Sequence, residues 1–405
     1  MANPIIWLTD RSRTTLDWSC PRKRYWNYHA HGRGIVPPNT PLELFLGTAL
    51  HDGLAAIATQ WRAEGEADVD TISTTTARVV RETLDVINTG DTQNPNFPRE
   101  QAALIEGLLR GFYHSAWPRL LAQYPQIISI EEEMTYPLSS GVVFMSRPDL
   151  VLANHDGEWV YVEYKSTSSK NEGWVNQWGT AVQVHSTIRA IEHTLGTAPS
   201  AVIVQGLYKG YVSYGKQNSP FCYAYYRQGT PPFSYPEWEY SYKAGFKKVP
   251  VWEMEGGLQN WIENMPEGVL GDQFPQTPPL FVKDGLIDAF FAQRLTREME
   301  IQMALQMIDG ADPDMQTDIL NTSFPQKFSE CSPSWGKPCG YRQACFGGGT
   351  NLLDLGWVPR EPHHTPEKIL FDGGYTCKGC GKGLHVTSDT PVDSMLCVEC
   401  TANKE

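Results

Sequence analysis

Two carboxylates and a lysine occur at a spacing that brings their side chains together on neighbouring strands. Asp149 lies in one apolar run, VVFMSRPDLVLA, and Glu163 and Lys165 lie in the next, EWVYVEYKST. Side chains alternate between the two faces of a strand, so Glu163 and Lys165 point to one face while Tyr164 points to the other. Carboxylates are hard ligands for Mg²⁺ or Mn²⁺, and such an ion beside a lysine is suited to hydrolysis of a phosphodiester. Taken alone, the pattern is common and more often marks surface charges on two ordinary strands.

Around these residues, the apolar pattern predicts strands at 126–138, 142–153 and 158–167, with a hairpin turn at 154–157. Helical spacing precedes them at 41–64, 70–88 and 98–123. A helix over 174–196, a strand over 200–210 and a long helix over 283–308 follow. This order favours an α/β fold with a mixed central β-sheet flanked by helices, after an N-terminal helical region.

The composition supports a globular protein with a sizeable core, since 41% of the 405 residues are hydrophobic. The sequence contains no apolar run long enough to span a membrane, and the start, MANPIIWLTDRSR, does not resemble a signal peptide. We therefore expect a cytoplasmic, intracellular protein without a membrane partner.

The net charge of −13 argues against a nucleic-acid partner only weakly, because binding requires a local positive surface rather than a basic average. One basic cluster near the start is interleaved with tryptophan and tyrosine, which suits binding to a DNA strand. An ordinary solvated basic face is the alternative. The cluster contains Arg11, Arg13, Arg22, Lys23, Arg24 and Arg33, of which Arg22, Lys23 and Arg24 are the predicted DNA contacts.

Nine cysteines in an intracellular protein are better explained as metal ligands than as disulfides. Four of them, one early and three late, would provide the thiolates that an iron–sulfur cluster or a structural zinc requires: Cys20, Cys331, Cys339 and Cys345. Another four form two Cys-x2-Cys pairs typical of a zinc ribbon: Cys377, Cys380, Cys397 and Cys400. The ribbon could contact DNA or a protein partner, or only fold the tail. Cys222 is expected in the core.

Two further residues could belong to the same site. His51 follows Gly47 on an otherwise apolar helix, and Gln183 lies on the helix after the Glu163 strand. A single histidine in that setting is more often a packed core residue, and a glutamine is often an exposed helix former.

Together, His51, Arg147-Pro148-Asp149, Glu163-Tyr164-Lys165 and Gln183 resemble the PD-(D/E)XK nuclease superfamily, and in particular its RecB-like exonuclease branch. The resemblance spans roughly residues 10–346 and implies a restriction-endonuclease-like core. It implies His51, Asp149 and Glu163 as ligands of Mg²⁺ or Mn²⁺, a catalytic Lys165, and a Gln183 that positions the site. Thr187 stands where the helix of this family usually has an aromatic residue.

The early and late cysteines resemble those of 4Fe–4S-bearing nucleases, the AddB type and the CRISPR-associated RecB-like exonucleases. This resemblance implies a 4Fe–4S cluster at Cys20, Cys331, Cys339 and Cys345 that joins the two ends of the nuclease domain. Zinc in the same four thiolates is the main alternative.

These expectations combine into a nuclease domain over 1–346, with a helical part at 41–125, a catalytic core at 126–210 and an extension at 211–346. A linker at 347–374 and a zinc ribbon at 375–405 follow. The expected function is a metal-dependent deoxyribonuclease, in particular an exonuclease on single-stranded or end-frayed DNA in recombination, repair or replication. The ribbon could bind a recombination or replication protein. A non-catalytic protein that binds DNA ends or single strands is the alternative, and an RNA-directed nuclease is a third.

Overall fold

The computed structural model describes residues 7–38, 42–87, 96–213, 216–227, 238–239, 244–281, 284–332, 338–346, 352–364 and 367. The predicted zinc ribbon at 375–405, with Cys377, Cys380, Cys397 and Cys400, lies outside these residues, as do parts of the predicted linker. Among the described helices, none is both long and apolar enough to cross a membrane.

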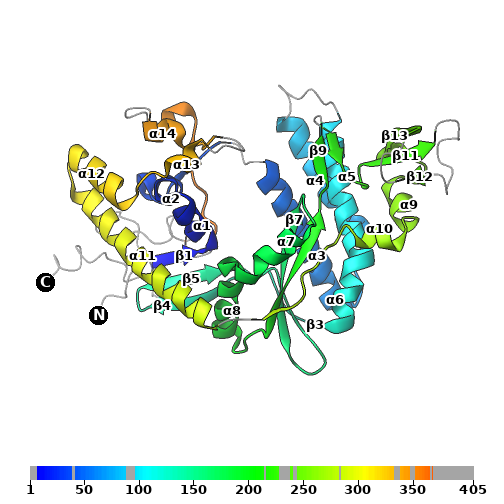
Figure 1. Ribbon diagram of the computed structural model, residues 1–405, viewed down its shortest axis with the longest axis horizontal. Coiled ribbons are helices and arrows are strands. Elements are labelled where there is room, and N and C mark those ends of the chain that lie inside the picture. Colours follow the sequence, from blue (N-terminus) through cyan, green and yellow to red (C-terminus); the bar gives the residue numbers. More distant parts are fainter. Residues whose placement is uncertain are drawn as a thin grey trace, which may run out of the picture.

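A five-stranded mixed sheet in the order β14-β8-β7-β6-β3 lies between the helices (Figure 1). Strands β7 and β8 are parallel, and the other neighbours are antiparallel. This arrangement confirms the predicted α/β class with a mixed sheet. The strands are β3 (Gln126–Ile130), β6 (Leu150–Ala153), β7 (Trp159–Thr167), β8 (Ala201–Tyr208) and β14 (Leu280–Phe281).

Strand β6 is apolar throughout, and most residues of β7 and β8 are buried, because both faces of this sheet are covered. Leu150 and Val162 belong to the core on one face, whereas Val151 and Tyr161 belong to the core on the other. The first face packs against α3 (Leu42–Glu64), α5 (Phe97–Gly111) and α6 (Trp117–Gln123), and the second against α7 (Glu172–Asn176) and α8 (Val182–Leu195). Helix α4 (Val69–Ile87) packs on α5, and the π-helical turn Phe112–Ala116 joins α5 to α6.

Two predicted strands are each divided in two, which corrects the sequence-based prediction. The run at 126–138 becomes β3 and β4 (Met134–Ser139), and the run at 142–153 becomes β5 (Val142–Ser146) and β6. Pro148 has no N–H to donate to a ladder, and Glu131 has a φ of 49°, so the chain changes direction at both points. Strands β4 and β5 join β1 (Trp7–Asp10) in a second sheet of order β1-β5-β4.

The predicted helix at 174–196 is also interrupted. It consists of α7, a 3₁₀ turn at Gln177–Thr180 and α8, which ends at Gly196 in the left-handed conformation (φ 79°). Glycine adopts that conformation without steric cost, so the predicted C-terminal boundary is confirmed.

Residues beyond β8 form small antiparallel sheets and short helices. Cys222 is buried there, and its Sγ donates to the carbonyl of Glu100 at 3.2 Å, as expected for a core cysteine. The elements are β9 (Tyr211–Ser213), β10 (Lys216–Asn218), β11 (Tyr223–Arg227), β12 (Trp238–Glu239), β13 (Phe246–Pro250), α9 (Gly257–Glu263) and α10 (Glu267–Gly271).

The N-terminal segment packs against the long helix α11 (Asp284–Gly310) through buried charges. Glu298 of α11 is fully buried and accepts hydrogen bonds from Trp7 Nε1 at 2.8 Å, Thr9 Oγ1 at 2.5 Å and both terminal nitrogens of Arg24 at 2.9 and 2.5 Å. Arg294 pairs with the same carboxylate at 2.9 Å. One glutamate therefore joins β1, α2 (Pro21–Tyr28) and α11.

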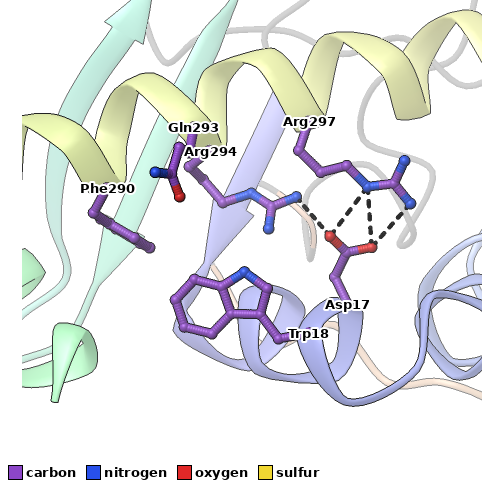
Figure 2. Close-up of a pocket in the computed structure, with 6 residues that line it drawn as sticks. All are labelled: Asp17, Trp18, Phe290, Gln293, Arg294 and Arg297. Carbon is purple, nitrogen blue, oxygen red and sulfur yellow. Dashed lines mark hydrogen bonds and ion pairs between the residues drawn. The ribbon is translucent and has the colours of Figure 1, made fainter. Parts of the chain in front are cut away.

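A second set of ion pairs fastens α1 (Arg11–Ser19) to the same helix. Figure 2 shows Asp17 facing Arg294 and Arg297, whose guanidinium groups lie 3.2 Å from its carboxylate. Helix α12 (Pro313–Ser323) packs beside α11, and the short helices α13 (Phe328–Cys331) and α14 (Arg342–Phe346) follow.

Part of the predicted linker is folded onto the N-terminal segment, which corrects that prediction. Strand β15 (Val358–Pro359) pairs with β2 (Ile35–Val36), and Arg360 and Arg13 lie 4.6 and 4.5 Å from the centre of the Tyr28 ring. Glu367 accepts from both arginines. The pairing of β15 with β2 and the burial of Glu367 between two arginines attach residues 358–360 and 367 to the folded body.

Replacing Glu298 by glutamine should lower the free energy of unfolding by about 3–5 kcal/mol, because it leaves Arg24 and Arg294 buried without their counter-charge. Urea unfolding followed by circular dichroism measures this change. Glu300→Gln on the same helix is the matched control, because the Glu300 side chain is 53% exposed. Equal unfolding midpoints for Glu298→Gln and the unmodified protein would contradict the role of Glu298.

The same carboxylate makes stability depend on pH. Burial disfavours its charged form, but Arg24 and Arg294 outweigh burial and lower the pKa of Glu298 from 4.5 to about 2. Its contribution is therefore complete above pH 4.5 and is lost as the pH falls towards about 2. The unfolding free energy of Glu298→Gln should fall less steeply across this interval than that of the unmodified protein.

Candidate active site

Asp149 lies where the chain passes from β5 in one sheet to β6 in the other. The ladder between β6 and β7 ends at the pair Leu150–Val162, and the Asp149 side chain continues it by accepting a hydrogen bond from Tyr164 N at 2.6 Å. This bond uses Oδ2 and leaves Oδ1 directed at His51. The carboxylate is therefore held in one orientation at the end of the sheet.

His51 reaches this carboxylate from α3. Its Nδ1 lies 3.1 Å from Asp149 Oδ1 and 3.4 Å from Glu131 Oε1, and its ring packs edge-on against Tyr164. Burial disfavours the imidazolium, but the two carboxylates outweigh burial and raise the pKa of His51 to about 10. A divalent cation held here would have to displace that proton, because only the neutral imidazole is a ligand.

Glu131 is the third residue near His51 and Asp149, and the sequence did not identify it. It directly follows β3, its N–H donates to the Asp149 carbonyl at 3.2 Å, and its Oε2 lies 3.1 Å from Arg147 Nε. Its φ of 49° is a strained conformation for a glutamate, which the surrounding contacts maintain. The three consecutive glutamates at 131–133, within the strand predicted over 126–138, were the available indication.

The ligand atoms of His51, Glu131 and Asp149 all lie within 4.8 Å of one another. Two carboxylates and one imidazole form a ligand set suited to Mn²⁺, and to Mg²⁺ with additional oxygen ligands. The donor set therefore fits the divalent cation that the sequence predicted, with Glu131 as a third contributor.

Glu163 and Lys165 lie on the next strand, as predicted from the alternation along β7. Lys165 Nζ pairs with Glu163 Oε1, and Arg11 Nη1 from α1 donates to the same oxygen at 2.6 Å. Burial disfavours the charged carboxylate, but Arg11 and Lys165 outweigh burial and lower the pKa of Glu163 to about 2. Tyr164 points to the opposite face, into the core beside Phe112. The contact between Arg11 and Glu163 had no indication in the sequence.

Gln183 lies in the first turn of α8, and its side chain is outside the part of the chain that the structure describes. Its predicted positioning role stays a prediction.

The cysteines predicted to bind an iron–sulfur cluster lie near one another: Cys20, Cys331, Cys339 and Cys345. Cys20 joins α1 to α2, Cys331 ends α13, and Cys339 N donates to the Cys331 carbonyl at 3.2 Å. Burial raises the pKa of Cys331, and Cys20 and Cys339 raise it further; Cys345 likewise interacts with Cys20 and Cys331. Within the described ranges, no three of these sulfur atoms lie within 4.8 Å of one another.

The predicted DNA contacts at residues 22–24 need correction. Arg24 is 0% exposed and paired with Glu298, and Arg22 is 6% exposed and donates to the Phe324 carbonyl at 2.8 Å. Both arginines serve to fasten helices, so they offer no charge to a DNA strand at the surface. Lys23 is half-buried.

The family model of the PD-(D/E)XK nuclease superfamily matches residues 13–212. The matched range contains His51, Glu131, Asp149, Glu163 and Lys165, and begins just after Arg11. No curated protein matches the chain. The match confirms the resemblance at the level of the superfamily and indicates a metal-dependent nuclease, with DNA as the substrate that this superfamily implies. The RecB-like branch, the iron–sulfur cluster and the zinc ribbon stay predictions.

Glu131→Gln should weaken Mn²⁺ binding at least as much as loss of an outer-shell partner does, roughly tenfold to a hundredfold, because a charged ligand becomes neutral. Isothermal titration of the DNA-free protein with Mn²⁺ measures the change. Glu132→Gln is the matched control, since the adjacent Glu132 side chain is 52% exposed and 3.9 Å from Arg62. Unchanged Mn²⁺ affinity in Glu131→Gln would exclude Glu131 from the site.

Proposed function

We propose that this chain is a metal-dependent deoxyribonuclease of the RecB-like branch. The observation that carries the proposal is the group of His51, Glu131 and Asp149, whose ligand atoms lie within 4.8 Å of one another. The Glu163–Lys165 pair stands on the adjoining strand. An acidic, histidine-containing cation site beside a lysine is suited to phosphodiester hydrolysis.

Each residue has a distinct role in this proposal. His51, Glu131 and Asp149 would hold the cation, which when bound would supply Lewis acidity and lower the pKa of a bound water. The backbone N–H of Tyr164 fixes Asp149 Oδ2 and leaves Oδ1 for the cation. Lys165, whose side chain is 20% exposed, offsets negative charge on the phosphate, and its pairing with Glu163 orients the lysine side chain. Water attacks the phosphodiester directly, so no covalent intermediate forms on the chain.

The proposed substrate is DNA, cleaved exonucleolytically from single-stranded or frayed ends in recombination, repair or replication. This finer assignment rests on the resemblance of the motifs to RecB-like exonucleases. A non-catalytic protein that binds DNA ends is the rival, and the presence of Asp149, Glu163 and Lys165 together speaks against it, because binding alone does not require the full set.

Asp149→Asn and Lys165→Ala should each abolish cleavage of end-labelled DNA in the presence of Mn²⁺. The first removes a cation ligand that also ends the β6–β7 ladder, and the second removes the charge next to the phosphate. A gel time course on single-stranded DNA, duplex DNA and RNA measures the loss and separates the substrate classes. Circular dichroism shows whether each variant is folded.

Two outcomes would reject the assignment. If Lys165→Ala cuts DNA at the unmodified rate, the site is wrong. If the unmodified protein binds DNA but leaves it intact with Mn²⁺, and a chelator changes nothing, the non-catalytic alternative holds.

A 4Fe–4S cluster at Cys20, Cys331, Cys339 and Cys345 and a zinc ribbon at Cys377, Cys380, Cys397 and Cys400 complete the proposal. The cluster is supported by the proximity of the first four cysteines, which come from both ends of the domain. Zinc held by the same four thiolates is the alternative. The ribbon is a candidate contact for DNA or for a recombination or replication protein.

Protein purified without oxygen should therefore be brown, with the broad visible absorption of thiolate-bound iron. Metal analysis should find four iron atoms and one zinc per chain under this proposal, and the Cys331→Ser and Cys339→Ser variants should lose the iron but keep the zinc. Colourless protein with two zinc ions per chain would replace the cluster by a zinc site and leave the nuclease proposal intact.

A further inference from the structure

Arg11 lies at the candidate active site but comes from a different part of the chain than the other site residues. It is the first residue of α1, before the range that matches the nuclease family. Its Nη1 lies 2.6 Å from Glu163 Oε1, the oxygen that also pairs with Lys165. Two cations therefore share one oxygen of a buried carboxylate.

The backbone of Arg11 is fixed, while its side chain reaches the surface. Asp10, the residue before it, caps α1 by accepting from Arg13 N at 2.7 Å and lies 3.2 Å from His364 Nε2. The Arg11 side chain is nonetheless 40% exposed, whereas that of Glu163 is 2% exposed. The guanidinium can therefore change partner without any movement of the helix.

Glu163 is paired with Arg11 and Lys165 and lies outside the candidate cation site. Among the described residues, the ligand group consists of His51, Glu131 and Asp149, and Glu163 is not part of it. A carboxylate already neutralised by Arg11 and Lys165 attracts a further cation weakly. The charge of Glu163, with a smaller contribution from Asp149, raises the pKa of Arg11, so the guanidinium lies within the field of both carboxylates.

A phosphodiester is a better partner for this guanidinium than a carboxylate oxygen that it shares with a lysine. Arginine binds phosphate through two parallel N–H donors, a geometry that its planar fork matches. In the present contact, a single Arg11 nitrogen donates to Glu163.

We propose that Arg11 couples substrate binding to completion of the cation site, an inference that rests on the proposed nuclease function. In the free protein its guanidinium holds Glu163. When DNA binds, the guanidinium moves to a phosphodiester oxygen, and the released Glu163 carboxylate joins His51, Glu131 and Asp149 as a ligand. Arg11 is thus a substrate-binding residue and a positioning residue for Glu163.

The test uses Arg11→Ala, the charge-preserving Arg11→Lys and the control Arg78→Ala, an exposed arginine paired with Glu82 on α4. In DNA-free protein, Arg11→Ala should bind Mn²⁺ more tightly, by roughly tenfold, because Glu163 loses a competing positive charge. Its affinity for a fluorescent single-stranded oligonucleotide in chelator should fall, and its cleavage rate should fall by roughly a hundredfold. Arg11→Lys keeps the positive charge, so its Mn²⁺ affinity, oligonucleotide affinity and cleavage rate should change in the same directions as in Arg11→Ala but by less. Arg78→Ala should match the unmodified protein.

A double-mutant cycle separates release of Glu163 from a general charge effect. In a Glu163→Gln background, Arg11→Ala should no longer tighten Mn²⁺ binding. Equal or weaker Mn²⁺ binding in Arg11→Ala, an unchanged oligonucleotide affinity, or the same gain of Mn²⁺ affinity in both backgrounds would each overturn the inference. These binding measurements do not depend on cleavage. A protein that does not cleave DNA would reject the proposed function, and the binding measurements would still decide the role of Arg11.

Discussion

The buried carboxylate of Glu298 is the interaction on which the rest of the structure depends. It gathers Trp7, Thr9, Arg24 and Arg294 around two oxygens in a region without solvent. Removing the charged groups of Glu298, Arg24 and Arg294 from water is costly, and their pairing with one another offsets that cost. These contacts attach the N-terminal segment to α11. Because that segment carries Arg11 and Cys20, the same carboxylate places one residue at the candidate active site and another in the cysteine set.

The candidate active site lies where regular strands end. Pro148 and the strained backbone of Glu131 divide two long apolar runs, and the chain passes between two sheets at these points. Backbone groups at a strand end need other partners, and Asp149 supplies one to Tyr164 N. The bond that completes the ladder is thus also the bond that directs Asp149 Oδ1 toward His51. Asp149 therefore contributes to the fold through Oδ2 and to the candidate cation site through Oδ1.

The N-terminal and C-terminal segments of the described chain are in contact. Strand β15 pairs with β2, and Glu367 joins Arg360 to Arg13 near the start of α1. His364 bridges Asp10 and Glu133, which flank Arg11 and Glu131 by one and two residues in the sequence. Segments well beyond the matched range 13–212 therefore support the site from outside the nuclease core.

The sequence alone determined what depends on local pattern. Alternation along a strand put Glu163 and Lys165 on one face and Tyr164 on the other, and apolar periodicity located the helix of His51. It could not determine which charges are buried or which distant groups meet. Arg24 and Glu298 are 274 residues apart, and Arg11 and Glu163 are 152 apart, yet each pair is in contact. A basic residue has the same local pattern on a surface as in a buried ion pair, so Arg22 and Arg24 were misread as DNA contacts. Only the tertiary structure decided that Glu131 lies beside His51 and Asp149 and that Arg11 contacts Glu163.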